Sequence, residues 1–325
     1  MHLRRLAVLA GLLLALLPAL PAAAQETRAL TVLDGSRIKK LTDGMLGIMG
    51  FMVVPDMAAS SLQVNRSSKE GDTGLSLTQI GSGFTVDPSF PLYLEGFLGF
   101  SRYDPRFVFS NGQEATRLPV RWNSLTASGG IGWDFPLTEN LVLRPLVNIS
   151  LGHIESDVSL LGRYLNQKYD VNVRFLSAGR LNNYGYGGSL VLDYSLYREK
   201  YEVDIELRYT QMLLQNFAGT SLAVRGSAVP QTLGLWSRFR FPTPYEVFTR
   251  PLRTVVEFSH SEFFGSEARA LGFETTTKLG GGLEVDIGRY ELGGLGLYAQ
   301  RVRLMGHSVF GPNVRGFSVG LGVSF

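Results

Sequence analysis

The last nine residues of the chain alternate strictly between large apolar and small side chains. One set is Phe317, Val319, Leu321, Val323 and Phe325, and the other is Ser318, Gly320, Gly322 and Ser324. Alternation with a period of two places the two sets on opposite faces of a β-strand. Gly and Ser are too small to build a soluble core, whereas an unbroken apolar row suits the lipid-facing wall of a transmembrane barrel. The ending therefore predicts a membrane-facing strand.

The same alternation recurs along the chain, often with charged residues on the second face. Between residues 201 and 210, apolar and aromatic positions alternate with Glu202, Asp204, Glu206 and Arg208. In a barrel, such charged faces line and fill the lumen, while the apolar faces meet lipid. Further inward charges are expected at Arg144, Arg238, Arg240, Lys278, Glu284 and Asp286. Glycines within these patterns, such as Gly280, are expected to relieve crowding and to permit sheet curvature.

The strands and their connections follow a regular rhythm. We expect strands near 60–66, 74–84, 91–101, 125–134, 140–152, 186–196, 199–210, 231–241, 252–260, 275–287, 293–304 and 315–325. Short connections, such as 87–89 and 288–290, alternate with long ones, such as 102–124 and 153–185. Outer-membrane barrels show this alternation because their periplasmic turns are short and their extracellular loops are long. The pattern predicts an all-β fold, an antiparallel up-and-down transmembrane β-barrel of about twelve strands in one domain, 58–325.

Residues 1–24 have the three parts of a secretory signal peptide. Arg4 and Arg5 precede the apolar stretch 6–20, and Ala22 and Ala24 occupy the small-residue positions of a cleavage site. The apolar stretch is short for a spanning helix, which disfavours an uncleaved anchor. No Cys follows it, so lipoprotein anchoring is excluded. We expect export through the inner membrane and residence in the outer membrane of a Gram-negative envelope.

Composition narrows the function classes. The formal net charge is +3, and removal of Arg4 and Arg5 with the signal peptide leaves +1. A nearly neutral chain gives no electrostatic reason to bind nucleic acid. The chain has no Cys, which rules out disulfides and thiolate metal sites. No cofactor is expected, and the oligomeric state is left open.

The segment 25–57 precedes the predicted barrel and contains the apolar run 45–54. The period of this run is ambiguous. It fits a helix that plugs the lumen, an additional strand, or a lead-in to the first strand. An apolar run of this kind should be buried, which favours a plug or the start of a strand over a free tail.

Several His residues stand near hydroxyl or acidic side chains, the types that hydrolases use. The Ser–His neighbours are His153 with Ser156, His260 with Ser259 and Ser261, and His307 with Ser308. Adjacent residues of a strand point to opposite faces, so the sets at His260 and His307 do not place a hydroxyl beside the imidazole. His153 and Ser156 meet only if a loop folds them together. We therefore assign no catalytic, cofactor-binding or metal-binding residue.

A rim site is the alternative. His153, Glu155 and Asp157 have strand spacing where a long loop begins, and His260 with Glu262 is similar. If the strands continue, each set shares a face that we expect to point into the barrel mouth. Such a site could serve a protease or a phospholipase, or hold a divalent metal weakly.

The chain resembles the solitary outer-membrane barrel proteins of autotransporter type. The resemblance is carried by the signal up to Ala24, the short region before the barrel, the stretches 90–96, 101–105 and 130–136, and the ending 316–325. It implies a twelve-stranded barrel with a helix through the pore before the first strand, where residues 36–54 would lie. That segment departs from the family pattern because it is rich in Gly and Met and leads to no passenger, so we do not expect passenger secretion.

The terminal Phe325 resembles the signal that the barrel-assembly machinery reads in its substrates. The expected partners are thus this machinery and outer-membrane lipid. The expected function is that of a non-enzymatic, autotransporter-like barrel, structural or permeable to small solutes in a porin-like manner. The alternative is an outer-membrane hydrolase, a protease or phospholipase with an active site at the rim.

Overall fold

The computed structural model describes residues 46–47, 49–53, 61–66, 73–104, 106–110, 115–119, 121–157, 180–217, 226–247, 249–288, 293–294, 297–298 and 300–324. All of them belong to one compact unit, 35–325. The predicted signal peptide 1–24, the first part of the segment 25–57 and the terminal Phe325 lie outside the described residues.

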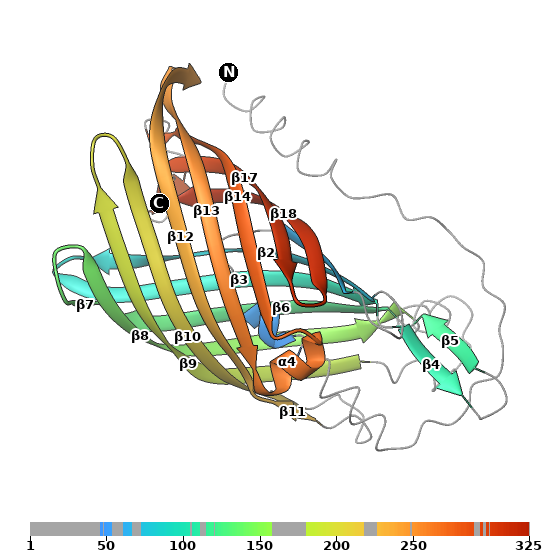
Figure 1. Cartoon of the computed structure of the whole chain (residues 1–325). Coiled ribbons are helices and arrows are strands. Elements are labelled where there is room, and N and C mark those ends of the chain that lie inside the picture. Colours follow the sequence, from blue (N-terminus) through green and yellow to red (C-terminus); the bar gives the residue numbers. More distant parts are fainter. Residues whose placement is uncertain are drawn as a thin grey trace, which may run out of the picture. The chain divides into compact units, whose positions relative to one another are not determined.

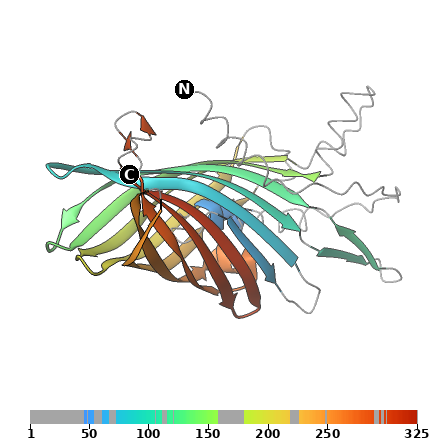
Figure 2. The ribbon, with the colours of Figure 1, turned by 90° about the horizontal axis from the view of Figure 1, so that it is seen from above.

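Within the described residues, twelve antiparallel strands form a closed cycle of neighbours (Figures 1 and 2). In order they are β1 (Ser61–Arg66), β2 (Thr73–Asp87), β3 (Phe90–Asp104), β6 (Trp122–Trp133), β8 (Leu141–Ser156), β9 (Arg180–Tyr197), β10 (Glu202–Asn216), β12 (Pro230–Val247), β13 (Arg250–Phe264), β14 (Thr275–Asp286), β17 (Arg301–Gly311) and β18 (Val314–Ser324). The cycle closes where β1 pairs with β18, from Ser61 opposite Val319 to Arg66 opposite Val314. The predicted all-β barrel of about twelve strands is confirmed.

The connections define two ends of the barrel. The loop end carries the connections that follow β1, β3, β8, β10, β13 and β17, and the turn end carries the others. At the loop end lie the hairpin of β4 (Arg106–Ser110) and β5 (Ala115–Pro119), the short strand β11 (Ser227–Ala228) and the helix α4 (Gly265–Leu271). At the turn end lie β7 (Phe135–Pro136), β15 (Gly293–Gly294) and β16 (Leu297–Tyr298).

The predicted bounds of one strand were wrong. The segment 293–304 was predicted as a strand after a short turn, but β17 begins at Arg301, opposite Asp286, and ends at Gly311. The connection before β17 is therefore long, and the one after it is the tight turn of Pro312 and Asn313. Proline and a left-handed residue are typical of such turns, and Asn313 has φ 60°. The short–long rhythm fails at these two connections.

The outer face of the ring is apolar. On β18, Phe317, Val319 and Leu321 are each at least 50% exposed, whereas Ser318 is 2% exposed. Other exposed apolar side chains around the ring include Ile80, Leu98, Phe100, Leu125, Ile131, Val147, Ile149, Leu190, Leu279, Leu283 and Leu304. A belt of this extent needs an apolar environment, as the lipid-facing wall of a barrel has. No helix in the described part of the chain is long and apolar enough to cross a membrane.

The inner face is divided into two zones. Toward the turn end, β10 points Asp204, Glu206 and Arg208 inward, and toward the loop end it points Met212 and Leu214 inward. The lumen is thus charged along part of its length and apolar at the loop end. The apolar zone can bury other apolar segments of the chain, and the charged zone requires paired side chains.

Candidate functional site

The apolar zone of the lumen holds the helical residues 46–47 and 49–53, which we call the plug helix (Figure 2). Leu46, Met49, Met52 and Val53 are each at most 4% exposed. A short helix that is apolar on more than one side is stable only when it is enclosed. The described part of the predicted segment 25–57 is therefore a helix inside the barrel.

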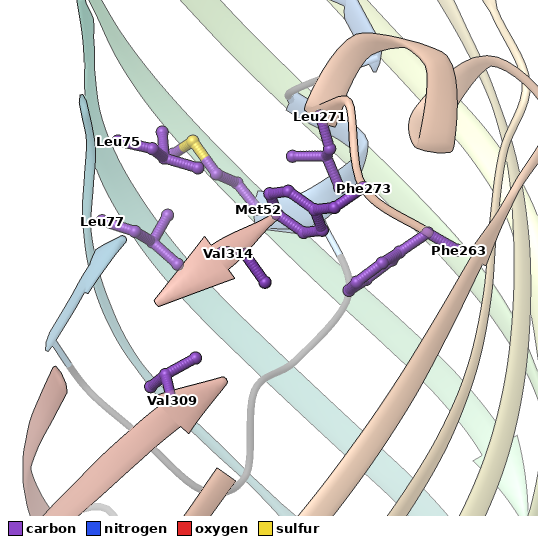
Figure 3. Packing of buried hydrophobic residues seen from close by; sticks show 8 residues of the cluster. All are labelled: Met52, Leu75, Leu77, Phe263, Leu271, Phe273, Val309 and Val314. Carbon is purple, nitrogen blue, oxygen red and sulfur yellow. The ribbon is translucent and has the colours of Figure 1, made fainter. Parts of the chain in front are cut away.

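Two hydrophobic clusters enclose the plug helix. In the first, Met52 lies with side chains of β2, β13, β17, β18 and the α4 region: Leu75, Leu77, Phe263, Val309, Val314, Leu271 and Phe273 (Figure 3). In the second, Leu46, Met49 and Val53 lie with side chains of β8, β9, β10 and β11: Ile154, Leu181, Met212, Leu214 and Ala228. Contacts on both sides of the lumen hold the helix, so it is not attached to a single wall.

Polar contacts fix the position of the plug helix. Gln79 Nε2 donates a hydrogen bond to the Met52 carbonyl at 3.0 Å. Ser124 Oγ contacts Met52 Sδ at 3.1 Å, and Asn183 Nδ2 contacts Met49 Sδ at 2.9 Å. Hydrogen bonds to sulfur are weak, so the carbonyl contact is the strongest of the three.

Close packing accounts for Gly47 and Gly50 in the plug helix. A Cβ at Gly47 would clash with Ala270 of α4, and one at Gly50 would clash with Pro230. The plug helix therefore approaches α4 and β12 at backbone distance, which only Gly permits. α4 is itself ended by Gly272, which takes a left-handed conformation with φ 73°.

Beyond the plug helix, charged side chains pair across the lumen. Arg208 of β10 donates to both carboxylate oxygens of Glu95 of β3, at 2.9 and 2.6 Å. Asn148 Nδ2 donates to Glu95 Oε1 at 2.8 Å, and Arg208 also donates to Ser189 Oγ at 3.2 Å. A bidentate Arg–carboxylate pair is the geometry in which a buried ion pair is best satisfied. This pair ties strands that are not neighbours in the ring.

Further ion pairs lie nearer the turn end. Arg144 pairs with Asp134 and, at 3.2 Å, with Asp193, and its guanidinium lies 3.8 Å from the centre of the Tyr93 ring. Arg240 pairs with Asp204 at 2.7 Å. The same group extends through Glu202, Glu284, Arg301 and Arg303. These pairs confirm that the charged faces expected from the sequence point into the lumen and pair there.

One buried row joins four strands. Arg238 donates to Glu257 Oε1 at 2.5 Å, and His307 Nε2 lies 2.9 Å from Glu257 Oε2. The strand between Glu257 and His307 contributes Gly280, which is opposite both in register. A Cβ at Gly280 would overlap the His307 ring, so this Gly relieves crowding as expected.

The predicted His153, Glu155 and Asp157 share a face, but that face points away from the barrel mouth. His153 and Glu155 have the strand parity of the exposed Val147, Ile149 and Leu151, although Glu155 itself is buried, and Asp157 follows the end of β8. His153 Nε2 lies 3.6 Å from Glu155 Oε2, and its Nδ1 contacts Asn182 Oδ1 at 2.6 Å. Asp157 accepts hydrogen bonds from Arg102 and Asn123. The expectation that this set lines the mouth was wrong, because inward positions of β8 are the even ones.

His260 and Glu262 also lie on the outer face, with Val256 and Phe264. His260 Nε2 is 3.9 Å from Glu262 Oε1. Its Nδ1 is 2.9 Å from Thr277 Oγ1, a hydroxyl of the neighbouring strand that sequence inspection missed. This contact depends on the pairing of β13 with β14, which puts His260 opposite Thr277. The sequence of either strand alone does not indicate that pairing.

The remaining pairs do not form a site. Ser259 points inward and His260 outward, and Ser308 is exposed while His307 is buried. Ser156 was predicted as a neighbour of His153, and its side chain lies outside the described part of the structure. Within the described part of the chain, no group of three or more His, Asp or Glu residues is arranged to hold a metal ion.

Glu267 of α4 is a buried acid that no sequence pattern singles out. It is fully buried beside the plug helix, and its Oε2 accepts a hydrogen bond from Thr232 Oγ1 at 2.8 Å. Burial raises the pKa of Glu267 to about 8, and the Thr232 hydrogen bond opposes the shift. Burial dominates because removing a carboxylate from water disfavours its charged form.

The raised pKa predicts a pH-dependent stability. Between its usual pKa of 4.5 and about 8, folded Glu267 keeps a proton that the unfolded chain releases. Stability should therefore fall as pH rises through this window, by at most about 1.4 kcal/mol per pH unit. Glu267→Gln should flatten the fall in melting temperature of the detergent-solubilised protein between pH 5 and 8. The half-exposed Glu262→Gln is the control, and an equal slope in the Glu267→Gln variant would contradict the assignment.

The closed antiparallel ring, its apolar outer belt and its charged lumen define an outer-membrane β-barrel. No family model matches the sequence, and no curated protein matches it. The β domain of the Bordetella autotransporter BrkA is similar in structure, with 14% identity, 82% of this chain and 96% of that chain covered, and a TM-score of 0.44. The translocator domain of NalP from Neisseria meningitidis has 11% identity, 89% and 97% coverage, and a TM-score of 0.40.

The transport unit of AIDA-I from Escherichia coli gives 11% identity, 88% and 98% coverage, and a TM-score of 0.44. At such identities the likeness concerns the fold alone.

Proposed function

We propose that the protein is a non-enzymatic integral outer-membrane barrel, structural or permeable to small solutes, whose lumen is closed at the loop end by the plug helix. The observation that carries the proposal is the enclosure of Leu46, Met49 and Met52 by inward side chains from opposite walls. A barrel of this size without a plug has room for a conduit, because interiors widen with strand number. The charged zone beyond the plug suits a hydrated path more than a passenger-binding surface.

Two features of the chain indicate its proposed partners: the apolar outer belt and the C-terminal strand. Outer-membrane lipid covers the apolar belt, and the barrel-assembly machinery reads the C-terminal strand that ends in Phe325. The signal peptide 1–24 directs export and is cleaved near Gln25. The plug helix occupies the lumen, so we expect no passenger to pass through it.

Planar-bilayer recording of the intact protein tests the closed state. We expect small, intermittent conductance steps, since paired charges and the plug helix obstruct the lumen. A large and steady open-pore current from the intact chain would contradict the proposal. Boiled protein serves as the control for currents that come from detergent or from damaged membranes.

A hydrolase is the second candidate, and one contact favours it. The His260 imidazole lies on the outer face near the loop end, between a hydroxyl and a carboxylate. Its Nδ1 is 2.9 Å from Thr277 Oγ1, and its Nε2 is 3.9 Å from Glu262 Oε1. A hydroxyl, a base and an orienting acid are the parts of a nucleophilic site. Exposed Leu279 and Phe264 beside them provide an apolar surface for acyl chains.

Assays on phospholipid and peptide substrates separate the two candidates. If the barrel is non-enzymatic, purified protein should release neither fatty acid nor peptide above the level of the His260→Ala and His153→Ala variants. Turnover that disappears in Thr277→Val and in His260→Ala, while Thr276→Val remains active, would reject the non-enzymatic proposal. If turnover is lost only in His153→Ala, the hydrolytic site would instead lie at His153, Glu155 and Asp157.

A further inference from the structure

A cavity of about 60 Å³ lies in the lumen, bordered by Phe51 of the plug helix and Glu267 of α4. Its wall comes from β10, β12, β13 and β14. The hollow results from small inward residues: Thr232, Gly234, Ser259, Ser261 and Thr276. A Cβ at Gly234 would meet only Ser261 Oγ, at 3.8 Å, so the space in front of this Gly is open.

Two buried polar atoms that border the cavity have no hydrogen-bond partner. They are Glu267 Oε1, an oxygen of the carboxyl group, and Trp236 Nε1, an indole donor. Buried polar groups are nearly always paired, so an unpaired acceptor and an unpaired donor on two residues that line the same cavity indicate an occupant that supplies both roles. A hydroxyl group is the simplest chemistry that donates and accepts.

The charges around the cavity argue against an ion. Glu206, Arg208 and Lys278 line it, so an ion of either sign meets repulsion as well as attraction. Arg208 is already held by both oxygens of Glu95. Because burial raises the pKa of Glu267 to about 8, that carboxyl is neutral at pH 7 and does not attract a cation. In the neutral form the proton lies on Oε2 and is donated to the Thr232 hydroxyl 2.8 Å away, so Oε1 is the carbonyl oxygen and remains an acceptor. The side chains that remain are hydroxyls and aromatic rings.

We propose that this cavity binds a small neutral polyol of glycerol size as a subsite of the conduit. One hydroxyl donates to Glu267 Oε1, another accepts from Trp236 Nε1, and the rest bond to the Ser and Thr hydroxyls of the wall. The volume corresponds to roughly four to six water-sized spheres, which admits a molecule of about six non-hydrogen atoms and excludes a disaccharide. The inference rests on the proposed function, since the lumen must admit a solute.

Saturation-transfer NMR on the full-length protein in detergent tests the site, with glycerol as the probe. We expect saturable binding in the millimolar range, and no saturable signal from glycine, acetate, methylammonium or maltose. Trp236→Phe keeps an aromatic ring beside Arg238 and removes the indole donor, so it should weaken binding about tenfold. Gly234→Leu should abolish binding by filling the hollow, whereas Gly234→Ala should weaken it less.

Absence of saturable glycerol binding, or equal binding by Gly234→Leu, would overturn the inference. So would tighter binding of glycine or either ion. If Gly234→Leu does not fold, Trp236→Phe carries the test, because an aromatic ring still packs beside Arg238 and the barrel should still fold. If glycerol crosses the barrel but does not bind in this cavity, the site is rejected and the permeable conduit is not. If glycerol binds but does not cross, the permeable conduit is rejected and the site is not.

Discussion

Removing residues 30–56 should convert intermittent conductance into a steady open-pore current. The deletion takes away the plug helix, whose Leu46, Met49 and Met52 fill the apolar zone of the lumen. We expect the mean current in planar bilayers to rise about tenfold, since a twelve-stranded ring is wider than its own side chains fill. An unchanged current would show that the plug helix is not what closes the barrel.

Two point variants give the same test without a deletion. Gly47→Val and Gly50→Val put a side chain where the plug helix meets α4 and Pro230, so each should displace the helix and raise the current. Gly96→Val is the matched control, because a Cβ at Gly96 meets nothing within 4 Å. If all three variants conduct alike, the close contact of the plug helix is not essential to closure.

The second large effect is expected from Arg208→Met. This change leaves the buried Glu95 carboxylate without its bidentate partner, and breaking a buried pair on one side costs about 3–5 kcal/mol. Urea unfolding of the barrel, reconstituted in short-chain phospholipid vesicles and followed by tryptophan fluorescence, should show this loss. The double variant Glu95→Gln with Arg208→Met should recover most of it, because it removes the uncompensated charge.

Arg102→Met is the control for that experiment. Its partner Asp157 lies on the outer face, and both side chains are about one-third exposed. An exposed pair contributes about 0–1 kcal/mol, so this variant should unfold close to the wild type. Equal losses for Arg102→Met and Arg208→Met would contradict the view that the lumen pair ties opposite walls.

The alternation of apolar and polar residues along the strands predicts most of the fold. The final strand shows why: Phe317 and Ser318 differ so strongly in size and polarity that the membrane face could be assigned without a structure. The failure at 293–304 has a physical cause. A strand end is set by pairing with a neighbour, here Asp286 opposite Arg301, and the local pattern contains no information about that partner.

The candidate sites were harder to predict for the same reason. His260 meets Thr277, and His307 meets Glu257, only because specific strands are adjacent and in register. His307 was not considered as a lumen residue because its strand was expected to end before it. Glu267 is buried by the packing of α4 against the plug helix, and no periodicity in its seven-residue helix indicates burial.

The most direct test of the central claim is gel migration of the unboiled protein in SDS. A barrel with an apolar outer belt and a paired, plugged lumen should need detergent for solubility, resist SDS at room temperature, and migrate differently before and after boiling. Identical migration of both samples, together with solubility in the absence of detergent, would contradict the transmembrane barrel.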